Sequence, residues 1–333
     1  LEVTNKLLVT PEQVTVSFID GDYKMPACYM AEDYGPEFST SDCSAQEIKV
    51  RHSFMRVGER DYDPLVYDDR WMERFGYFSN ERRTFDPQYD QQEAGRVRLA
   101  NRFNIWKKVL ANQACAVARP TGAGSDLKIL DAARKKADDG CASIQGEGSV
   151  CAESVGRCTL PPIKREGVKK IVYYLNAGFP AALLPAAKAS VTSWNDALQT
   201  TAARLLFPND DQKNAKLLEQ RKQELGPVFE LQENGCSPAK VAEFVARFPD
   251  LAEKVPGGAG QAADLAGKDL LRACSALERA TAYRGADERF IWQRIGDLRY
   301  SMLYWVGIPT RMGLIGYGPA QADPETGEIV QAN

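Results

Sequence analysis

The chain has 333 residues, of which 44% are hydrophobic and 26% charged, as is usual for a globular protein. Its formal net charge of -3 at pH 7 gives no electrostatic reason to expect nucleic acid or an anionic membrane as a partner. No uninterrupted apolar run approaches the roughly 20 residues of a membrane span, and no N-terminal stretch has the layout of a signal peptide. The composition therefore predicts a globular chain without a transmembrane segment.

The first 160 residues predict strands and long loops. Residues 14–19 and 47–57 alternate apolar and polar side chains, which is typical of half-buried strands. Residues 61–104 are rich in both aromatic and acidic side chains. Interleaved Arg and aromatic residues also occur where proteins stack on nucleic acid, but the many carboxylates favour packing within the protein.

Helices and a domain boundary are expected next along the chain. Part of 94–118 and the stretch 126–138 are expected to be helical. Residues 140–162 contain three cysteines among Gly and Ser, and we interpret them as a crosslinked loop. This loop divides an N-terminal extension, residues 1–160, from a second domain, residues 161–333.

The second domain begins with a sharper pattern. Residues 171–175, Ile-Val-Tyr-Tyr-Leu, predict a strand because of their β-branched and aromatic content. A turn then leads into a helix with an apolar stripe at three- and four-residue spacing: Leu184, Ala187, Val191, Trp194, Leu198, Ala202 and Leu205. A helical insertion is expected at about 207–295.

The last forty residues return to strands. Residues 298–306 predict a strand buried on both faces, because Leu303 and Trp305 stand where a half-exposed strand would have polar residues. The run Asp323-Pro324-Glu325-Thr326-Gly327 is turn chemistry, and Glu328 to Val330 begins another strand. Since the sequence ends within that strand, we expect the native polypeptide to continue beyond Asn333 or to have been cleaved there.

Eight cysteines predict disulfides. No two are spaced as C-x-x-C, and His52 is the only histidine, so the pattern does not resemble a structural zinc site. An even number in loop-like sequence favours disulfides and an oxidising compartment over free thiols in a cytosolic protein. We expect Cys28 to pair with Cys43 and Cys236 with Cys274. Three connectivities stay open for the other four: Cys115, Cys141, Cys151 and Cys158.

Two further groups of possible ligands have simpler structural explanations. His52 lies in an alternating strand and cannot alone supply a zinc shell, which favours a half-buried structural histidine. Four carboxylates offer oxygen ligands for calcium but lack the spacing of a known calcium loop, which favours solvated charge: Asp61, Asp63, Asp68 and Asp69.

The sequence also provides little support for a catalytic nucleophile or for a phosphate-binding loop. Ser193 and Ser301 have no neighbouring base in the sequence, so nucleophilic catalysis has no support. Residues 257–260, Gly-Gly-Ala-Gly, are not followed by Lys and Ser or Thr. We therefore interpret this run as a flexible linker between helices.

Three groups of segments carry a family resemblance. The tail contains residues 297–306, DLRYSMLYWV, then Gly316-Tyr317-Gly318-Pro319, then Asp323-Pro324-Glu325-Thr326-Gly327-Glu328-Ile329. The second group is the strand at 171–175 with Phe179-Pro180 and the helix bearing Trp194-Asn195. The third is the aromatic region, from Tyr67-Asp68-Asp69 to Asn104-Ile105-Trp106. Together they resemble large bacterial zinc-dependent metalloproteases of myxobacterial, lipoprotein-like type, which have a metzincin-like catalytic domain.

The resemblance implies an α+β fold, in which a strand- and loop-rich extension precedes an incomplete metzincin-like domain of mixed sheet and helices. In the family, an H-E-x-x-H helix follows the tail strand and holds zinc, and its Glu activates the bound water. This sequence has no such motif, so no catalytic or metal residue is assigned and the zinc ligands of the complete protein are expected outside this chain.

The resemblance also implies a substrate-cleft edge, to which a peptide would add as a strand. Its candidate residues are Gly316, Tyr317, Gly318, Gly327, Glu328, Ile329 and Val330. An interior position for the last strand is equally compatible with the sequence, because sheet edges are usually protected.

These implications predict the non-catalytic N-terminal part of an exported zinc metallopeptidase, located in the periplasm, on the outer membrane as a lipoprotein, or outside the cell. The expected partners are a downstream catalytic segment, covalently continuous or cleaved and retained, and a peptide or protein substrate. The chain alone is expected to be inactive and to bind no stoichiometric zinc. The alternative is an exported structural or binding protein on the same scaffold, without catalytic activity.

Overall fold

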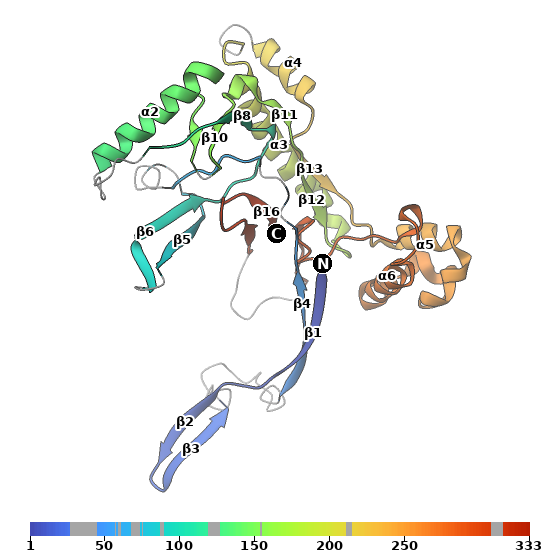
Figure 1. The fold of residues 1–333 in the computed structure, drawn as a ribbon. Coiled ribbons are helices and arrows are strands. Elements are labelled where there is room, and N and C mark those ends of the chain that lie inside the picture. The colour runs from blue at the N-terminus through green and yellow to red at the C-terminus, as the bar shows by residue number, and fades with distance from the viewer. Residues whose placement is uncertain are drawn as a thin grey trace. The chain divides into compact units, whose positions relative to one another are not determined.

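The computed structural model describes residues 1–26, 45–56, 58, 61–67, 74, 76–86, 90–118, 127–153, 155–210, 215–307 and 316–333. The architecture mixes helices and strands, in agreement with the α+β prediction (Figure 1). Intrachain contacts divide the protein into two units, Leu1–Arg56 and Val57–Asn333. Residues on both sides of the boundary expected near 160 therefore belong to the second unit.

The first unit consists of two antiparallel strand pairs. β1 (Glu2–Val9) pairs with β4 (Gln46–Ser53) along its whole length. β2 (Gln13–Phe18) and β3 (Gly21–Pro26) form a hairpin. The alternating stretches 14–19 and 47–57 fall in β2 and β4, so their prediction as strands is largely confirmed, although β4 ends at Ser53.

Antiparallel strands form the first part of the second unit. They are the β5–β6 hairpin (Ser79–Asp86 and Asp90–Ala100), the β7–β11 pair (Trp106–Lys108 and Glu166–Val168) and the sheet β8-β10-β9 (Leu110–Ala114, Arg157–Thr159 and Cys151–Ala152). The helix expected within 94–118 is wrong, because these residues lie largely in β6, β7 and β8. The partners of β7 and β8 lie far along the chain, and a local pattern does not reveal them.

A long helix covers the β8-β10-β9 sheet. α2 (Leu127–Gln145) contacts β9 and β10, which confirms the helix predicted at 126–138 and extends it. A short 3-10 helix, η4 (Pro162–Lys164), follows β10. The segment between β8 and β11 is thus a small α and β layer, crosslinked as described below.

A parallel three-stranded sheet forms the centre of the second unit. β12 (Ile171–Leu175) lies between β13 (Phe229–Gln232) and β14 (Ser301–Leu303), and both neighbours run parallel to it. The strand predicted at 171–175 is confirmed. Parallel neighbours require long crossover connections, and here these connections carry most of the helices.

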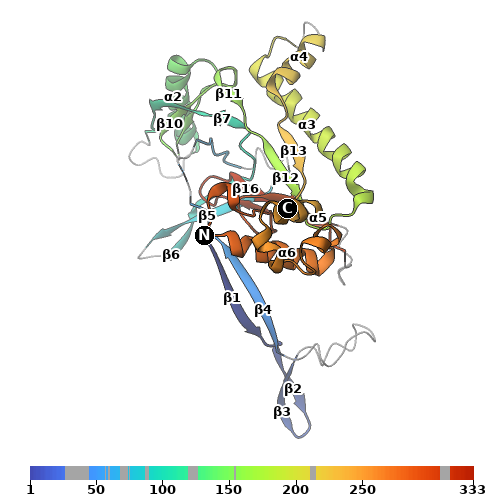
Figure 2. The same ribbon diagram turned by 90° about the vertical axis from the view of Figure 1, so that its right-hand side faces the viewer.

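The crossover from β12 to β13 contains η5 (Ala181–Leu183), α3 (Leu184–Leu206) and α4 (Ala215–Leu225). Figure 2 shows α3 alongside β13, in agreement with their contacts. The Oδ1 atom of Asn195 accepts hydrogen bonds from the backbone N–H groups of Val228 at 2.8 Å and Phe229 at 3.0 Å. One side chain therefore fixes the helix to the beginning of the next strand.

The crossover from β13 to β14 is a helical subdomain. It contains α5 (Pro238–Arg247), α6 (Gly267–Thr281) and three 3-10 helices, η6 (Pro249–Lys254), η7 (Ala259–Asp264) and η8 (Ala286–Glu288). Most elements between 207 and 295 are helical, but β13 lies there too. The subdomain has its own core, which includes Val241, Val245, Leu270 and Leu277, and the predicted disulfide Cys236–Cys274 is present in it.

The strand expected at 298–306 is much shorter than predicted, and its burial on both faces is wrong. Ser301 and Met302 are buried, but residues 303–306 are exposed. Among the described residues no strand pairs with 304–306, so these apolar side chains have no second layer to pack against.

The Cys236–Cys274 bridge should stabilise the helical subdomain. It closes a loop with a sequence separation of 38 residues, for which chain entropy predicts a contribution of about 4 kcal/mol. The double variant Cys236→Ala/Cys274→Ala should lose that amount in denaturant unfolding under oxidising conditions. With a reductant present, wild type and variant should converge, and a persistent difference would show that the loss comes from packing rather than from the bridge.

Candidate functional site

A cavity of about 720 Å³ lies between α3, the parallel sheet and the segment 101–109. Five of the seven residues in the predicted apolar stripe of α3 line it: Ala187, Val191, Trp194, Leu198 and Leu205. The stripe therefore lines this open space along much of its length, whereas Ala202 is buried in a core with Trp106 and Val228. Trp194 keeps 63% of its surface exposed, although it lies on the apolar face of the helix.

The opposite wall comes from the sheet. β12 contributes Ile171 and Tyr173, β13 contributes Phe229 and Leu231, and β14 contributes Leu303. The rings of Tyr173 and Phe229 are 5.1 Å apart between centroids. Because aromatic and aliphatic side chains dominate both walls, the cavity suits an apolar occupant.

One end of the cavity is polar. Nε of Arg102 donates to the hydroxyl oxygen of Tyr62 at 2.9 Å, and another N–H of the same guanidinium donates to the backbone carbonyl of Asp63. Arg165 lies 4.0 Å from the Asp63 carboxylate and over the ring of Trp106, 5.5 Å from its centroid. Two cations and one carboxylate thus meet at this end.

Burial is the main influence on the pKa values of Tyr62 and Asp63 at this polar end. It raises the pKa of Tyr62 to about 12, against the opposing effect of Arg102. Burial also raises the pKa of Asp63, although Arg102 and Arg165 both favour its ionised form. The phenol therefore stays neutral at physiological pH and serves as a hydrogen-bonding group.

Asp61 holds the cavity wall in place. Its Oδ1 atom accepts hydrogen bonds from the backbone N–H groups of Val109 at 2.9 Å and Leu110 at 2.8 Å, and its backbone carbonyl accepts one from Asn104 Nδ2 at 2.8 Å. Asp61 and Asp63 are partly buried, so the expectation of solvated charge is wrong for them. Asp68 and Asp69 lie outside the described residues.

The tail forms a tight hairpin, as its turn chemistry predicted. β15 (Ala320–Ala322) pairs antiparallel with β16 (Ile329–Ala332). The backbone carbonyl of Asp323 accepts from Gly327 N–H at 2.8 Å, and its carboxylate accepts from Glu325 N–H at 2.8 Å. The predicted start of a strand at 328–330 agrees with β16.

Residues before β16 pair with the segment that begins at Ala100. Arg102 N–H donates to the carbonyl of Gly327 at 3.1 Å, and Ile329 N–H donates to the carbonyl of Arg102 at 2.9 Å. With β15 on its other side, the beginning of β16 is interior. Of the substrate-cleft candidates, Ile329 lines the cavity, Gly327 and Glu328 lie in this pairing, and Gly316, Tyr317 and Gly318 precede β15, whereas Val330 lies within β16.

The remaining candidates lie elsewhere. His52 is in β4 of the first unit and is exposed rather than half-buried, with its ring 6.5 Å from that of Phe54. Ser301 is buried, and its hydroxyl oxygen accepts from Ala332 N–H at 3.1 Å, while Ser193 is exposed on α3. The glycine run 257–260 connects η6 with η7.

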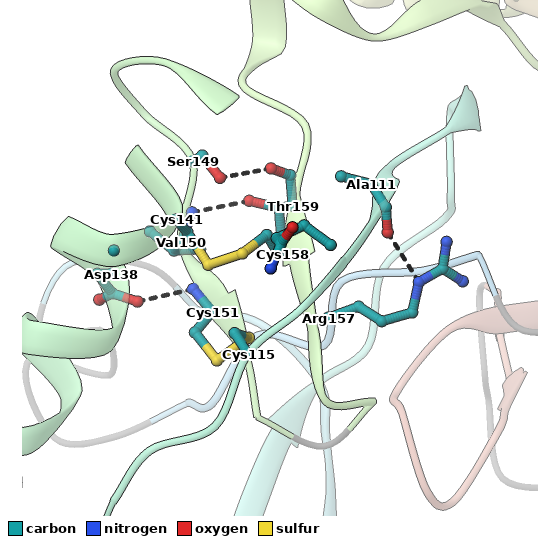
Figure 3. Close-up of a disulfide and its surroundings, with 12 residues drawn as sticks. Ala111, Cys115, Asp138, Cys141, Ser149, Val150, Cys151, Arg157, Cys158 and Thr159 are labelled. Atoms are coloured by element: carbon teal, nitrogen blue, oxygen red, sulfur yellow. Dashed lines mark hydrogen bonds between the residues drawn. A yellow bond between two sulfur atoms is a disulfide. The ribbon is translucent and has the colours of Figure 1, made fainter. Parts of the chain in front are cut away.

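The four cysteines left open form two adjacent bridges (Figure 3). Cys115 pairs with Cys151, and Cys141 pairs with Cys158. With Cys236–Cys274, the three bridges confirm disulfides in the described chain. Cys28 and Cys43 lie outside the described residues, so their pairing stays a prediction.

Sequence reasoning missed the polar end of the cavity. Tyr62, Arg102 and Arg165 are separated by long stretches of chain and belong to no local motif. Two signals pointed to it: the run Asn101-Arg102-Phe103-Asn104 lay inside a segment that resembled the family, and Asp63 was among the candidate oxygen ligands.

Comparisons of the chain with known protein families, with curated proteins and with solved structures find no match. Among the described helices, α3 included, none combines the length and the hydropathy that a membrane-spanning helix needs. The functional assignment therefore depends on the resemblance of the segments and on the cavity they surround.

Substitution of Gly327 should lower the free energy of unfolding for two reasons, its left-handed backbone conformation and the close approach of a neighbouring carbonyl group. It has φ +77°, and a Cβ atom would lie 2.5 Å from the carbonyl oxygen of Ala100. Gly178 has the same φ with no atom within 4 Å of such a Cβ, so it is a matched control. Gly178→Ala should cost about 1–2 kcal/mol of unfolding free energy from the left-handed backbone. Gly327→Ala should cost roughly 1–3 kcal/mol more, from overpacking; equal losses in denaturant unfolding would contradict the close approach.

Glu328 should make stability depend on pH. Burial raises its pKa, while Lys169 and the hydrogen bond from Asn104 oppose the shift. Because the pKa of this carboxyl is higher in the folded than in the unfolded protein, its contribution to the free energy of unfolding is fully present below the ordinary pKa of about 4. That contribution is lost as the pH rises through the folded value. Glu328→Gln should therefore be more stable than wild type at pH 7. The two proteins should be equally stable near pH 3.5, which is about one unit below the ordinary pKa of a glutamate side chain. The exposed Glu288→Gln is the control, and the same pH trend in it would remove the assignment to Glu328.

Proposed function

We propose that this chain is the non-catalytic N-terminal part of an exported zinc metallopeptidase. The observation that carries the proposal is that all three groups of segments with the family resemblance border one cavity. β12 and α3 form two of its walls, Leu303 and Ile329 of the tail reach it, and residues 101–106 of the aromatic region complete it.

The occupant that fits the cavity is an amphipathic helix from the catalytic segment. Such a helix inserts apolar side chains at three- and four-residue spacing into a groove with matching walls. The uncovered stripe of α3 and the sheet opposite provide those walls, and exposed apolar surface of this extent is typical of an interaction site. In the complete protein this helix would carry H-E-x-x-H, whose histidines hold the zinc and whose Glu activates water.

A peptide substrate would bind at the tail hairpin. The beginning of β16 has partners on both sides, whereas β15 pairs only with β16 among the described strands. An added peptide strand pairs with backbone N–H and C=O groups at a strand edge. The carbonyl of Ala322 accepts from Asn80 Nδ2 at 3.4 Å, so the peptide would pair with the part of β15 before Ala322. Gly316, Tyr317 and Gly318, which lead into β15, would then lie beside the peptide.

The test compares this chain with the natural protein. The oxidised 333-residue chain should hydrolyse no casein and bind no stoichiometric zinc, whereas the natural protein should contain a helix with H-E-x-x-H, one zinc per chain and caseinolytic activity. Intact mass, metal analysis and a casein assay measure these properties. Caseinolysis by the oxidised chain alone, or a natural protein whose mass shows no further segment, would refute the proposal.

Binding of the catalytic-segment helix in the cavity can be tested separately. Trp194→Ala should weaken association between this chain and a separately produced catalytic segment, because Trp194 lines the cavity and is largely exposed. Tyr283→Ala is the matched control, since Tyr283 is fully exposed and lies outside the cavity lining. Neither substitution should change the unfolding midpoint of the chain. Equal association of both variants would place the contact elsewhere.

A non-enzymatic binding protein is the second candidate. A volume of about 720 Å³ lies within the range of pockets that hold small ligands, roughly 300–1,000 Å³, and the arginines at one end suit the carboxylate of an apolar molecule. This alternative predicts that a fluorescent long-chain carboxylic acid binds the oxidised chain stoichiometrically and that Arg102→Gln weakens it, with no peptidase activity in the natural protein.

A further inference from the structure

The two disulfides between α2 and the β8-β10-β9 sheet are in contact with each other. The Sγ atoms of Cys115, Cys141 and Cys151 all lie within 4.8 Å of one another, although Cys141 belongs to a different bridge from the other two. The fourth sulfur, that of Cys158, is bonded to Cys141 and lies outside this group of three. Figure 3 shows the two bridges side by side.

This spacing is close to that of a tetrahedral metal site. Zinc–sulfur bonds of about 2.3 Å place the sulfurs of a tetrahedron about 3.8 Å apart. Bonded pairs in the oxidised chain are shorter than this, and the distance between bridges is at most 4.8 Å for the three sulfurs named above. Reduction of both bridges would let each pair separate toward the metal-binding distance with small side-chain rotations.

The backbone that carries these cysteines is held by bonds other than the bridges. Cys151 and Cys158 are direct cross-strand partners in β9 and β10. Cys115 N–H donates to the carbonyl of Gly156 at 2.9 Å, and Cys151 N–H donates to Asp138 Oδ1 on α2 at 2.7 Å. The four cysteines, in α2, β9, β10 and directly after the end of β8, are therefore positioned before any metal arrives.

Neighbouring hydrogen bonds also hold the backbone segments that carry the four cysteines. The hydroxyl of Ser149 donates to the carbonyl of Thr159 at 2.6 Å, and the hydroxyl oxygen of Thr159 accepts from Val150 N–H at 2.9 Å. Arg157 Nε donates to the carbonyl of Ala111 in β8 at 2.8 Å. Each of these bonds joins the strands or turns that flank a cysteine, so reduction need not release the sulfurs from one another (Figure 3).

Burial also favours a structural metal. Cys141 and Cys158 are each 1% exposed and pack against small apolar residues, which excludes competing water ligands. Cys115 is only partly buried, which gives a reductant and a metal ion an entry route. Four thiolates suit Zn²⁺, a borderline-soft cation that prefers sulfur and tetrahedral geometry.

We propose that the reduced chain binds one Zn²⁺ through Cys115, Cys141, Cys151 and Cys158. A phosphine reductant breaks each S–S bond, and one water per disulfide supplies the oxygen of the phosphine oxide and the protons of the two thiols. Two phosphine molecules thus supply the four electrons that convert the two disulfides into four thiols. The four thiols then lose four protons to solvent as they bind the ion. Under oxidising conditions the Cys141–Cys158 disulfide crosslinks α2 to β10 and the Cys115–Cys151 disulfide joins the end of β8 to β9, whereas under reducing conditions one zinc ion would join all four residues.

This proposal does not depend on the peptidase function. It also concerns a different state from the sequence-based expectation that the chain binds no zinc, which applies to the oxidised protein. No two of these cysteines have the close spacing of known zinc ligands, so the site could not be expected from sequence spacing.

The test uses the full chain with Cys28→Ser and Cys43→Ser, which removes two thiols outside the described residues. After anaerobic reduction with a phosphine and removal of the reductant, Co²⁺ should produce the intense visible bands and the thiolate charge-transfer absorption of a tetrahedral tetrathiolate. Zn²⁺ should displace Co²⁺ at one ion per chain. The oxidised chain should show neither effect.

Two double variants separate the site from ordinary thiol binding. Cys141→Ser/Cys158→Ser should lose stoichiometric binding, whereas Cys236→Ser/Cys274→Ser should retain it, because the latter bridge lies in the helical subdomain. The proposal is overturned if the reduced chain binds no metal, if both variants behave alike, or if reduction abolishes helical circular dichroism that zinc does not restore.

Discussion

The parallel pairing of β12 with two strands from distant parts of the chain is the constraint on which the second unit depends. β13 and β14 each follow a long crossover, so both crossovers must return to the same strand. This requirement positions α3 and the helical subdomain around one sheet. The carbonyl of Leu175, at the end of β12, accepts a hydrogen bond from Asn234 Nδ2 at 2.8 Å, which ties the base of the helical subdomain to the sheet.

The cavity is a consequence of this arrangement. α3 is fixed at its centre by Asn195 and contacts β13, but part of its apolar stripe lines an open space between the helix and the sheet. Polar groups lie at one end of the cavity. Tyr62 and Arg102 can be accommodated there because they form a hydrogen bond with each other, whereas a buried polar group without a partner would destabilise the fold. The apolar walls and the satisfied polar end together favour an occupant with an apolar face, which is the chemistry expected of a docked amphipathic helix.

Disulfides crosslink two regions of the second unit that differ in the size of their hydrophobic cores. The layer between β8 and β11 has a small core that includes three of its own cysteines, so the bridges replace part of the apolar burial that larger side chains would provide. The helical subdomain has a larger core and a single bridge. Two bridges in contact give the first region a sulfur-rich interior with chemistry of its own, whereas the isolated bridge of the second offers only two ligands.

The sequence by itself determined the elements whose signals are local. The strand at 171–175, the apolar stripe of α3 and the Asp-Pro-x-Thr-Gly turn all follow from the side chains within a few residues. The Cys236–Cys274 pairing was also predicted, although its two cysteines are separated by 38 residues.

Only the tertiary structure decided the features that join distant residues. Residues 94–118 form strands because their partners lie far along the chain or across a hairpin, and residues 303–306 are exposed because none of the described strands covers them. The polar end of the cavity and the choice among three cysteine connectivities likewise depend on contacts across tens of residues. The physical reason is that spacing along a chain specifies which face a side chain occupies, whereas pairing between elements specifies what that face meets.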